Sequence, residues 1–197
     1  MSEVGTSWRA DAVGMTLRWT GYAAAAWAIA YALGVRFYQA AGGTIGLSGE
    51  FEDPDGFQRA SFNAGVFLLL VGIGALAFVR PWGLKLPRWL VIIPALTGSA
   101  VALAHGLTAY VTKPLHALDV IQIDFPGQRD LDETSMFLWD LLFYEPWFLG
   151  LGVLTTLGAL YHHDRTGGSR FGRRGLLVYT AVMTLIIWTY ALVVVIK

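Results

Sequence analysis

The stretch FNAGVFLLLVGIGALAFV, residues 62–79, decides the fold of this chain. It contains no charged side chain, and the pair Arg80-Pro81 ends it. A helix needs about 20 mostly apolar residues to cross the hydrocarbon core of a bilayer. The stretch is therefore long enough to form one membrane-spanning helix.

Four further stretches are mostly apolar and of similar length, at residues 19–41, 89–110, 136–161 and 175–196. Together with 62–79 they take up more than half of the 197 residues, so little chain is left for a separate soluble domain. In lipid, every backbone polar group must be satisfied internally, which a helix achieves. We therefore predict an all-α polytopic membrane protein, with residues 1–197 forming one membrane domain, a five-helix transmembrane bundle.

The composition agrees with this class and excludes several others. Hydrophobic residues make up 55% and charged residues 14% of the chain, whereas an average soluble domain carries roughly 25% charge. With 14 basic and 14 acidic side chains and no cysteine, a nucleic-acid module with a basic face and a disulfide scaffold are both excluded. No nucleic-acid partner is expected. No cofactor is predicted either, because the chain lacks a glycine-rich phosphate loop.

The basic and acidic side chains are segregated along the chain. Basic residues collect in the N-terminal tail and in the connections 80–88 and 162–174, while acidic residues collect in the connections 42–61 and 111–135. Connections rich in Lys and Arg stay on the cytoplasmic side of a membrane. The pattern predicts a multi-pass protein of the cell membrane with its N-terminus inside and its C-terminus outside.

Several polar residues lie within the predicted spans. They are Arg36, Asn63, His105, Asp140 and Glu145, and with this orientation all five fall in the outer half of the bilayer. Ionisable residues in a membrane are costly and usually face the bundle interior or a water-filled cavity. Because four different spans contribute, we predict a polar site in the outer half of the bundle.

The fourth span contains the most informative segment, WDLLFYEPWF at residues 139–148. On a regular α-helix Asp140 and Tyr144 share one face, whereas Asp140 and Glu145 are turned apart by about 140°. Pro146 removes a backbone donor and predicts a kink. Two states of Glu145 stay open: a neutral proton donor, or an ionised partner of Arg36.

The candidate residues fall into two groups. The candidate catalytic residues are Glu145, Asp140 and His105, and the alternative for them is a structural network of ion pairs and helix-packing hydrogen bonds. The histidines lack the spacing of metal ligands, so no metal site is predicted. The candidate ligand-binding residues supply a guanidinium, an amide and aromatic walls: Arg36, Asn63, Trp139, Tyr144 and Trp147.

Three segments carry a resemblance to known proteins: GYAAAAW at 21–27, GGTIGL at 42–47 and WDLLFYEPW at 139–147. Together they resemble a bacterial family of small integral membrane proteins whose domain has no assigned function. This resemblance extends from the first span to the fourth. It implies a protein of the bacterial inner membrane and assigns no catalytic residue. A looser, architectural similarity links the chain to membrane terpene cyclases, which also use membrane-embedded carboxylates.

Three functions are compatible with these features. The first is a lipid- or partner-binding membrane protein without catalysis, whose partners would be membrane lipid, a lipophilic small molecule or another membrane protein. The second is an intramembrane acid–base enzyme of cyclase or isomerase type, acting on an isoprenoid-like lipid. The third, a transporter or proton pathway, is disfavoured because the inner halves of the spans are almost purely apolar.

Overall fold

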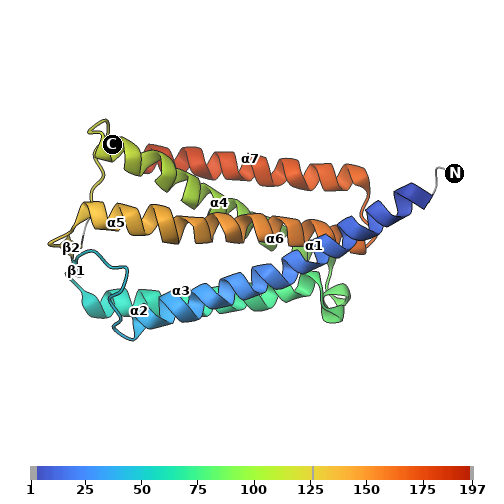
Figure 1. Cartoon of the computed structure of the whole chain (residues 1–197), viewed down its shortest axis with the longest axis horizontal. Helices are drawn as coiled ribbons and strands as arrows, with labels where there is room; N and C mark the ends of the chain where they lie inside the picture. Colours follow the sequence, from blue (N-terminus) through green and yellow to red (C-terminus); the bar gives the residue numbers. More distant parts are fainter. Residues whose placement is uncertain (1–3, 126, 196–197) are drawn as a thin grey trace.

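The structure is a computed structural model that describes residues 4–125 and 127–195. Long helices run side by side along one direction, with a two-stranded ladder at one end of the bundle (Figure 1). The prediction of a nearly all-α fold is therefore confirmed. In chain order the elements are α1 (Val4–Tyr31), a π-helical turn (Ala32–Phe37), α2 (Tyr38–Ala40), β1 (Glu50–Phe51), α3 (Pro54–Ala75), 3-10 turns (Leu76–Phe78 and Pro81–Lys85), α4 (Arg88–Ala117), β2 (Gln128–Arg129), α5 (Glu133–Trp139), a π-helical turn (Asp140–Tyr144), α6 (Glu145–Arg165) and α7 (Arg170–Val195).

Among the described residues, four helical stretches are long and apolar enough to cross a membrane. They correspond to the predicted spans 62–79, 89–110, 136–161 and 175–196, the last of which ends at Ile196, outside the described residues. α1 is not among the four, because alanine, tyrosine and tryptophan fill much of its length in place of leucine and valine. The qualifying stretches are Pro54–Phe78, Arg88–Ala117, Glu133–Arg165 and Arg170–Val195.

The helices extend beyond the bounds predicted from hydropathy. α3 begins at Pro54 rather than at residue 62, because the Asp53 carboxylate accepts a hydrogen bond of 2.8 Å from the Gly56 N–H. Proline at the first helical position suits such a start, since its missing N–H has no helical partner there. α4 likewise continues to Ala117, past residue 110. The predicted connections 42–61 and 111–135 are therefore shorter than the sequence indicated.

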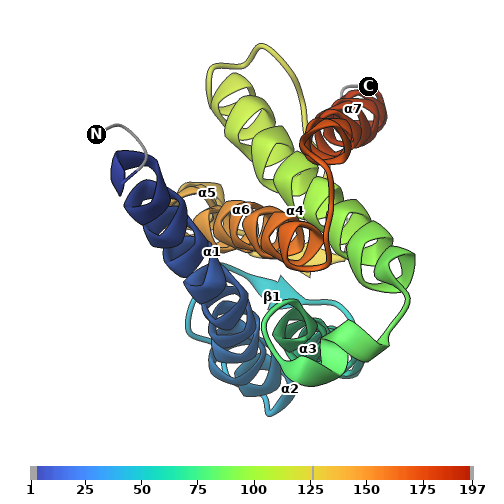
Figure 2. The ribbon, with the colours of Figure 1, turned by 90° about the vertical axis from the view of Figure 1, so that its right-hand side faces the viewer.

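α6 occupies the centre of the bundle. It packs against α1 on one side and α4 on the other, while α3 pairs with α1 and α7 pairs with α4 (Figure 2). The packed face of α1 carries Ala24 and Ala28 and continues to Ala32 in the π-helical turn that follows; the three are four residues apart and almost fully buried. Small residues at this spacing let helix backbones approach closely. Alanine in α1 thus serves packing more than hydropathy.

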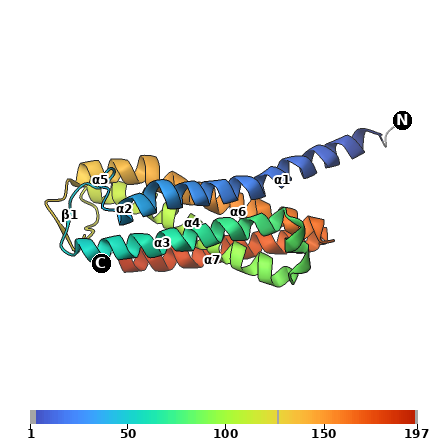
Figure 3. The ribbon, with the colours of Figure 1, turned by 90° about the horizontal axis from the view of Figure 1, so that it is seen from below.

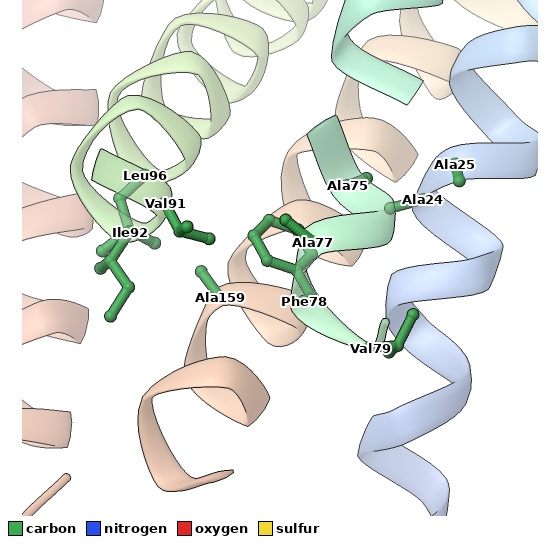
Figure 4. Close-up of a cluster of buried hydrophobic side chains, with 10 residues drawn as sticks. All are labelled: Ala24, Ala25, Ala75, Ala77, Phe78, Val79, Val91, Ile92, Leu96 and Ala159. Carbon is green, nitrogen blue, oxygen red and sulfur yellow. The ribbon is translucent and has the colours of Figure 1, made fainter. Parts of the chain in front are cut away.

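Phe78 is the largest side chain of the main buried cluster (Figure 4). It lies where the 3-10 turn after α3 meets α6, and a Cβ added to Gly158 would stand 2.5 Å from its ring. Gly158 therefore leaves the space that the Phe78 ring occupies. The buried cluster consists of Ala24, Ala25, Ala75, Ala77, Phe78, Val79, Val91, Ile92, Leu96 and Ala159.

The outward faces of the bundle are apolar. Phe67 on α3 is 66% exposed, and Ile186 and Val193 on α7 are also exposed. Contiguous apolar surface of this kind is rare on soluble monomers and marks contact with a membrane or a partner. These faces suit a lipid environment.

The two chain termini lie at opposite ends of the bundle (Figures 1 and 3). At the end where α7 finishes, β1 and β2 pair antiparallel, with Glu50 opposite Arg129 and Phe51 opposite Gln128. We call this the strand end. The ladder joins the connection after α2 to the connection after α4, which are far apart in the sequence.

Candidate functional site

A cavity of about 210 Å³ lies at the strand end of the bundle. Helices, the ladder and the glycine-containing connection after α2 all contribute to its wall. Charged and aromatic side chains face it together, which distinguishes it from the apolar packing elsewhere. The lining residues are Tyr31, Arg36, Gln39, Gly46, Leu47, Ser48, Gly49, Phe51, Phe57, His105, Gln128, Leu131, Met136, Asp140, Tyr144, Glu145 and Phe148.

Lys113 of α4 joins the two carboxylates of this site. Its ammonium Nζ donates a hydrogen bond to Asp140 Oδ2 and lies 3.5 Å from Glu145 Oε1. The side chains of Lys113 and Glu145 are only 12% and 5% exposed. A buried charge is costly unless it is paired, and here one cation serves two anions.

A π-helical turn brings these two carboxylates to the same side. Over Asp140–Tyr144 the hydrogen bonding shifts from the i−4 to the i−5 carbonyl, and the Glu145 N–H bonds to the Asp140 C=O. Residues five apart then come into line. The predicted separation of about 140° between Asp140 and Glu145 is therefore wrong, because it assumed a regular α-helix. Pro146, which cannot donate a helical hydrogen bond, follows directly.

A second π-helical turn, Ala32–Phe37, acts in the same way on the first helix. Tyr31 and Arg36, also five residues apart, both line the cavity, and the guanidinium carbon lies 5.6 Å from the centre of the tyrosine ring. In the described part of the chain, both π-helical turns thus border this cavity. π-Helical turns inside α-helices are frequent at functional sites.

Arg36 makes no ion pair with any carboxylate among the described residues. Its Nη1 donates to Gln39 Oε1 at 3.3 Å. Gln39 Nε2 donates to the Tyr144 hydroxyl at 3.5 Å, and that hydroxyl donates to the Gly46 carbonyl at 3.2 Å. A chain of hydrogen bonds therefore joins the first helix to α6 and to the connection after α2. Of the two states left open for Glu145, pairing with Arg36 is not observed, since Lys113 takes that place.

Gly46 lets the connection after α2 lie close over Tyr144. Its φ is +84°, in the left-handed region that favours glycine, and an added Cβ would stand 2.2 Å from the Tyr144 hydroxyl. Any larger residue would push the connection away from the cavity. The glycine-rich sequence noted at 42–47 thus covers the site.

His105 stands at the edge of the cavity. Its Nε2 lies 3.6 Å from Glu145 Oε2, too far for a normal hydrogen bond, and its ring packs 4.3 Å from the Phe148 ring. The His105 side chain is 56% exposed, although it lines the cavity. Glu145 Oε2 is buried and has no hydrogen-bond partner among the described residues.

The two tryptophan candidates lie behind the cavity wall. Trp147 packs against Trp27 with ring centres 4.1 Å apart, and its carbonyl accepts a hydrogen bond of 2.9 Å from Trp27 Nε1. Trp139 packs against Phe143 and Tyr144. Neither tryptophan lines the cavity.

Asn63 is separate from this site. It is exposed on α3 and lines a different, shallow hollow together with Phe62 and Gln58. Of the candidate residues, the structure therefore gathers at the cavity Arg36, His105, Asp140, Tyr144 and Glu145, and leaves out Asn63, Trp139 and Trp147.

Of the remaining histidines, His163 and His116 have local partners, whereas both ring nitrogens of the buried His162 lack a hydrogen-bond partner among the described residues. His163 Nδ1 accepts from Arg88 Nη2 at 3.0 Å, and its Nε2–H donates to the Ser169 carbonyl at 3.2 Å. His116 lies 3.2 Å from the Glu133 carboxylate. Among the described residues, no group of three or more His, Cys, Asp or Glu side chains could hold a metal ion.

Apolar helices around a buried cluster of charges indicate a membrane protein with an internal polar site. The chain belongs to the family described as "Protein of unknown function (DUF3995)", whose model matches residues 25–155. This confirms the predicted family of unknown function, and every residue that lines the cavity falls within the matched range. No curated protein and no solved structure matches the chain. The comparisons do not support the looser similarity to membrane terpene cyclases.

Proposed function

We propose that this protein binds a small polar molecule or a lipid headgroup in the cavity at the strand end. Glu145 carries the proposal, because it is buried, lines the cavity and keeps Oε2 without a hydrogen-bond partner among the described residues. A buried acceptor left without a donor costs about 1–3 kcal/mol. A bound ligand with an N–H or O–H group would supply the missing donor.

The proposal includes five spans, with the first formed by α1 and its continuation to Ala40. The packing of α1 supports a first span there, because α1 lies against both α3 and α6 along the bundle. Chain termini at opposite ends suit an odd number of crossings, and the basic connections 80–88 and 162–174 lie at the end away from the strands (Figure 1). In this arrangement the N-terminus is cytoplasmic, and the cavity lies in the outer half of a bacterial inner membrane.

Labelling of single introduced cysteines tests this arrangement, because the chain has no cysteine of its own that would react with the reagent. Val120 and Phe171 are exposed at opposite ends of the bundle, and Ser7 precedes the apolar part of α1. In intact cells we expect a membrane-impermeant maleimide to label Val120→Cys alone. Ser7→Cys and Phe171→Cys should react only after permeabilisation. Labelling of Ser7→Cys in intact cells would mean that α1 does not cross the membrane.

Mass spectrometry of the purified protein tests the binding function. We expect a discrete small molecule or lipid to co-purify with the wild type and to be reduced at least tenfold in Glu145→Gln, because the amide is uncharged and places a donor where the ligand's donor would lie. Glu133→Gln is the matched control, since it makes the same change at a half-exposed carboxylate outside the cavity. Equal recovery from all three proteins would contradict the proposal, provided that circular dichroism shows equal helicity.

One observation also favours a second function, acid–base chemistry on an isoprenoid-like or other lipid. His105 Nε2 and Glu145 Oε2 lie 3.6 Å apart at the cavity wall, and catalytic hydrogen bonds often tighten only when substrate binds. Glu145 would donate the proton, His105 would accept or relay it, and Asp140 would hold Lys113 in place. The same mass comparison separates the two functions, since an enzyme would leave the unreacted lipid in Glu145→Gln and its product in the wild type.

A further inference from the structure

The cavity has an anion-binding half, formed by Arg36. Among the described residues no carboxylate lies within ion-pair distance of this guanidinium, and its Nε is buried without a hydrogen-bond partner. Within the described part of the chain, the one hydrogen bond of the guanidinium runs from Nη1 to Gln39, and its carbon lies 5.6 Å from the centre of the Tyr31 ring. A guanidinium presents parallel N–H donors that match the oxygens of a carboxylate or phosphate. Arg36 is thus placed to hold an anionic group inside the cavity.

The acceptor part of the cavity is formed by Glu145, which also lines it. Lys113 engages Oε1, while Oε2 is buried without a hydrogen-bond partner among the described residues, 3.6 Å from His105 Nε2. Asp140 adds a second negative charge beside it, so the two carboxylates exceed the single positive charge of Lys113. Phe148, which packs against His105, also lines the cavity, and aromatic faces attract cations. This half is suited to a protonated amine with N–H donors.

The size of the cavity limits the ligand to one short group. A volume of about 210 Å³ is smaller than that of a drug-sized pocket, which is roughly 300–1,000 Å³. His105 both lines the cavity and is 56% exposed, so the cavity opens beside it on the flank of the bundle. A group could therefore enter either from solvent or, while still attached to acyl chains, from the bilayer.

We propose that the cavity holds a zwitterionic group, with its carboxylate or phosphate on Arg36 and its protonated amine on Glu145 Oε2. This proposal rests on the binding function proposed above and names the chemistry of the ligand. A free zwitterion and the headgroup of an aminophospholipid share this chemistry. A quaternary ammonium does not, because it has no N–H to donate.

The first experiment uses the wild-type chain, purified in detergent, and measures the shift of its unfolding temperature with added ligand. We expect phosphoethanolamine or β-alanine to raise this temperature. For the same rise in unfolding temperature, phosphocholine, inorganic phosphate and ethanolamine should each require at least a tenfold higher concentration. Equal effects of phosphoethanolamine and phosphocholine would overturn the proposal. So would the absence of any effect of phosphoethanolamine and β-alanine, if the vesicle experiment described next also finds no aminophospholipid bound to the protein.

A second experiment identifies the source of the group. The chain is reconstituted in vesicles of phosphatidylethanolamine, phosphatidylcholine or phosphatidylglycerol, re-extracted, and weighed by native mass spectrometry. Selective retention of phosphatidylethanolamine supports a lipid headgroup, and retention of none, with free phosphoethanolamine still binding, supports a free zwitterion. Equal retention of the three lipids contradicts a zwitterion-selective site.

Variants then assign the two halves. Arg36→Gln and Glu145→Gln should each raise the apparent Kd for the zwitterion at least tenfold, whereas the exposed controls Arg59→Gln and Glu133→Gln should leave it unchanged. If the co-purifying molecule is lost in Glu145→Gln but retained in Arg36→Gln, the binding function stands and the zwitterion proposal fails. The comparison of ligands on the wild type holds even where a variant does not fold.

Discussion

We expect Lys113→Met to lower the free energy of unfolding by about 3–5 kcal/mol, the cost of removing one partner from a buried ion pair. The substitution leaves Asp140 and Glu145 facing each other without the ammonium that now bonds to both. The measurement is thermal unfolding in detergent, followed by circular dichroism and by the monodisperse fraction in size exclusion.

Two further variants make this result specific. Lys85→Met makes the same change at an exposed position in the 3-10 turn before α4, and its effect should stay within about 0.5 kcal/mol. Adding Asp140→Asn and Glu145→Gln to Lys113→Met should recover most of the loss, because no uncompensated charge then remains. A Lys113→Met protein as stable as the wild type would show that the charge cluster is not buried as described.

Phe78→Ala should lower the free energy of unfolding by about 3 kcal/mol. This is the lower end of the range for a buried phenylalanine. In detergent the apolar surroundings reduce the contribution from transfer out of water, so most of the loss comes from the cavity that the substitution leaves in the packing. Phe78 is 2% exposed, and Gly158 leaves no side chain that could move into the space. The measurement is again the unfolding transition in detergent.

The matched control is Phe67→Ala on α3. Phe67 is exposed on the outward face, so its removal should change the stability by no more than about 0.5 kcal/mol. Similar losses for the two phenylalanines would mean that the cluster around Phe78 is not a packed core.

Hydropathy alone predicted the four apolar spans, since a charge-free run such as 62–79 has few alternatives to a helix. It did not predict where the helices end. The start of α3 at Pro54 depends on the side-chain cap from Asp53, which acts on the backbone and leaves no trace in hydropathy. The sequence also predicted a span at 19–41, where the structure has a helix, but that helix is not among the four apolar stretches.

At the site, intramembrane charge identified Arg36, His105, Asp140 and Glu145, all of which line the cavity. Lys113 was missed, because a lysine at the end of a span usually extends its ammonium towards the headgroups. Only the partner carboxylates on another helix turn it inward.

The contact between Asp140 and Glu145 through one cation could not be read from the sequence either. It depends on a π-helical turn, and helical periodicity assumes that every turn is the same. Gln39, which connects Arg36 to Tyr144, carries no charge and gave no signal. Pro146 was the available clue, since it marks where regular hydrogen bonding must change.

The ion cluster also constrains how the protein is made. During translation, Lys113 is added to the chain before its two partners: Asp140 follows 27 residues later and Glu145 follows 32 residues later. A lone lysine costs about 2.5–3.5 kcal/mol on insertion scales at the centre of a spanning helix, and less near the end of one, where Lys113 lies in α4. α4 and the helix that contains α6 therefore gain by leaving the translocon as a pair, with their charges already neutralised. Insertion of the bundle would then proceed by hairpins, and α6 would reach α1 only after α4 has joined it.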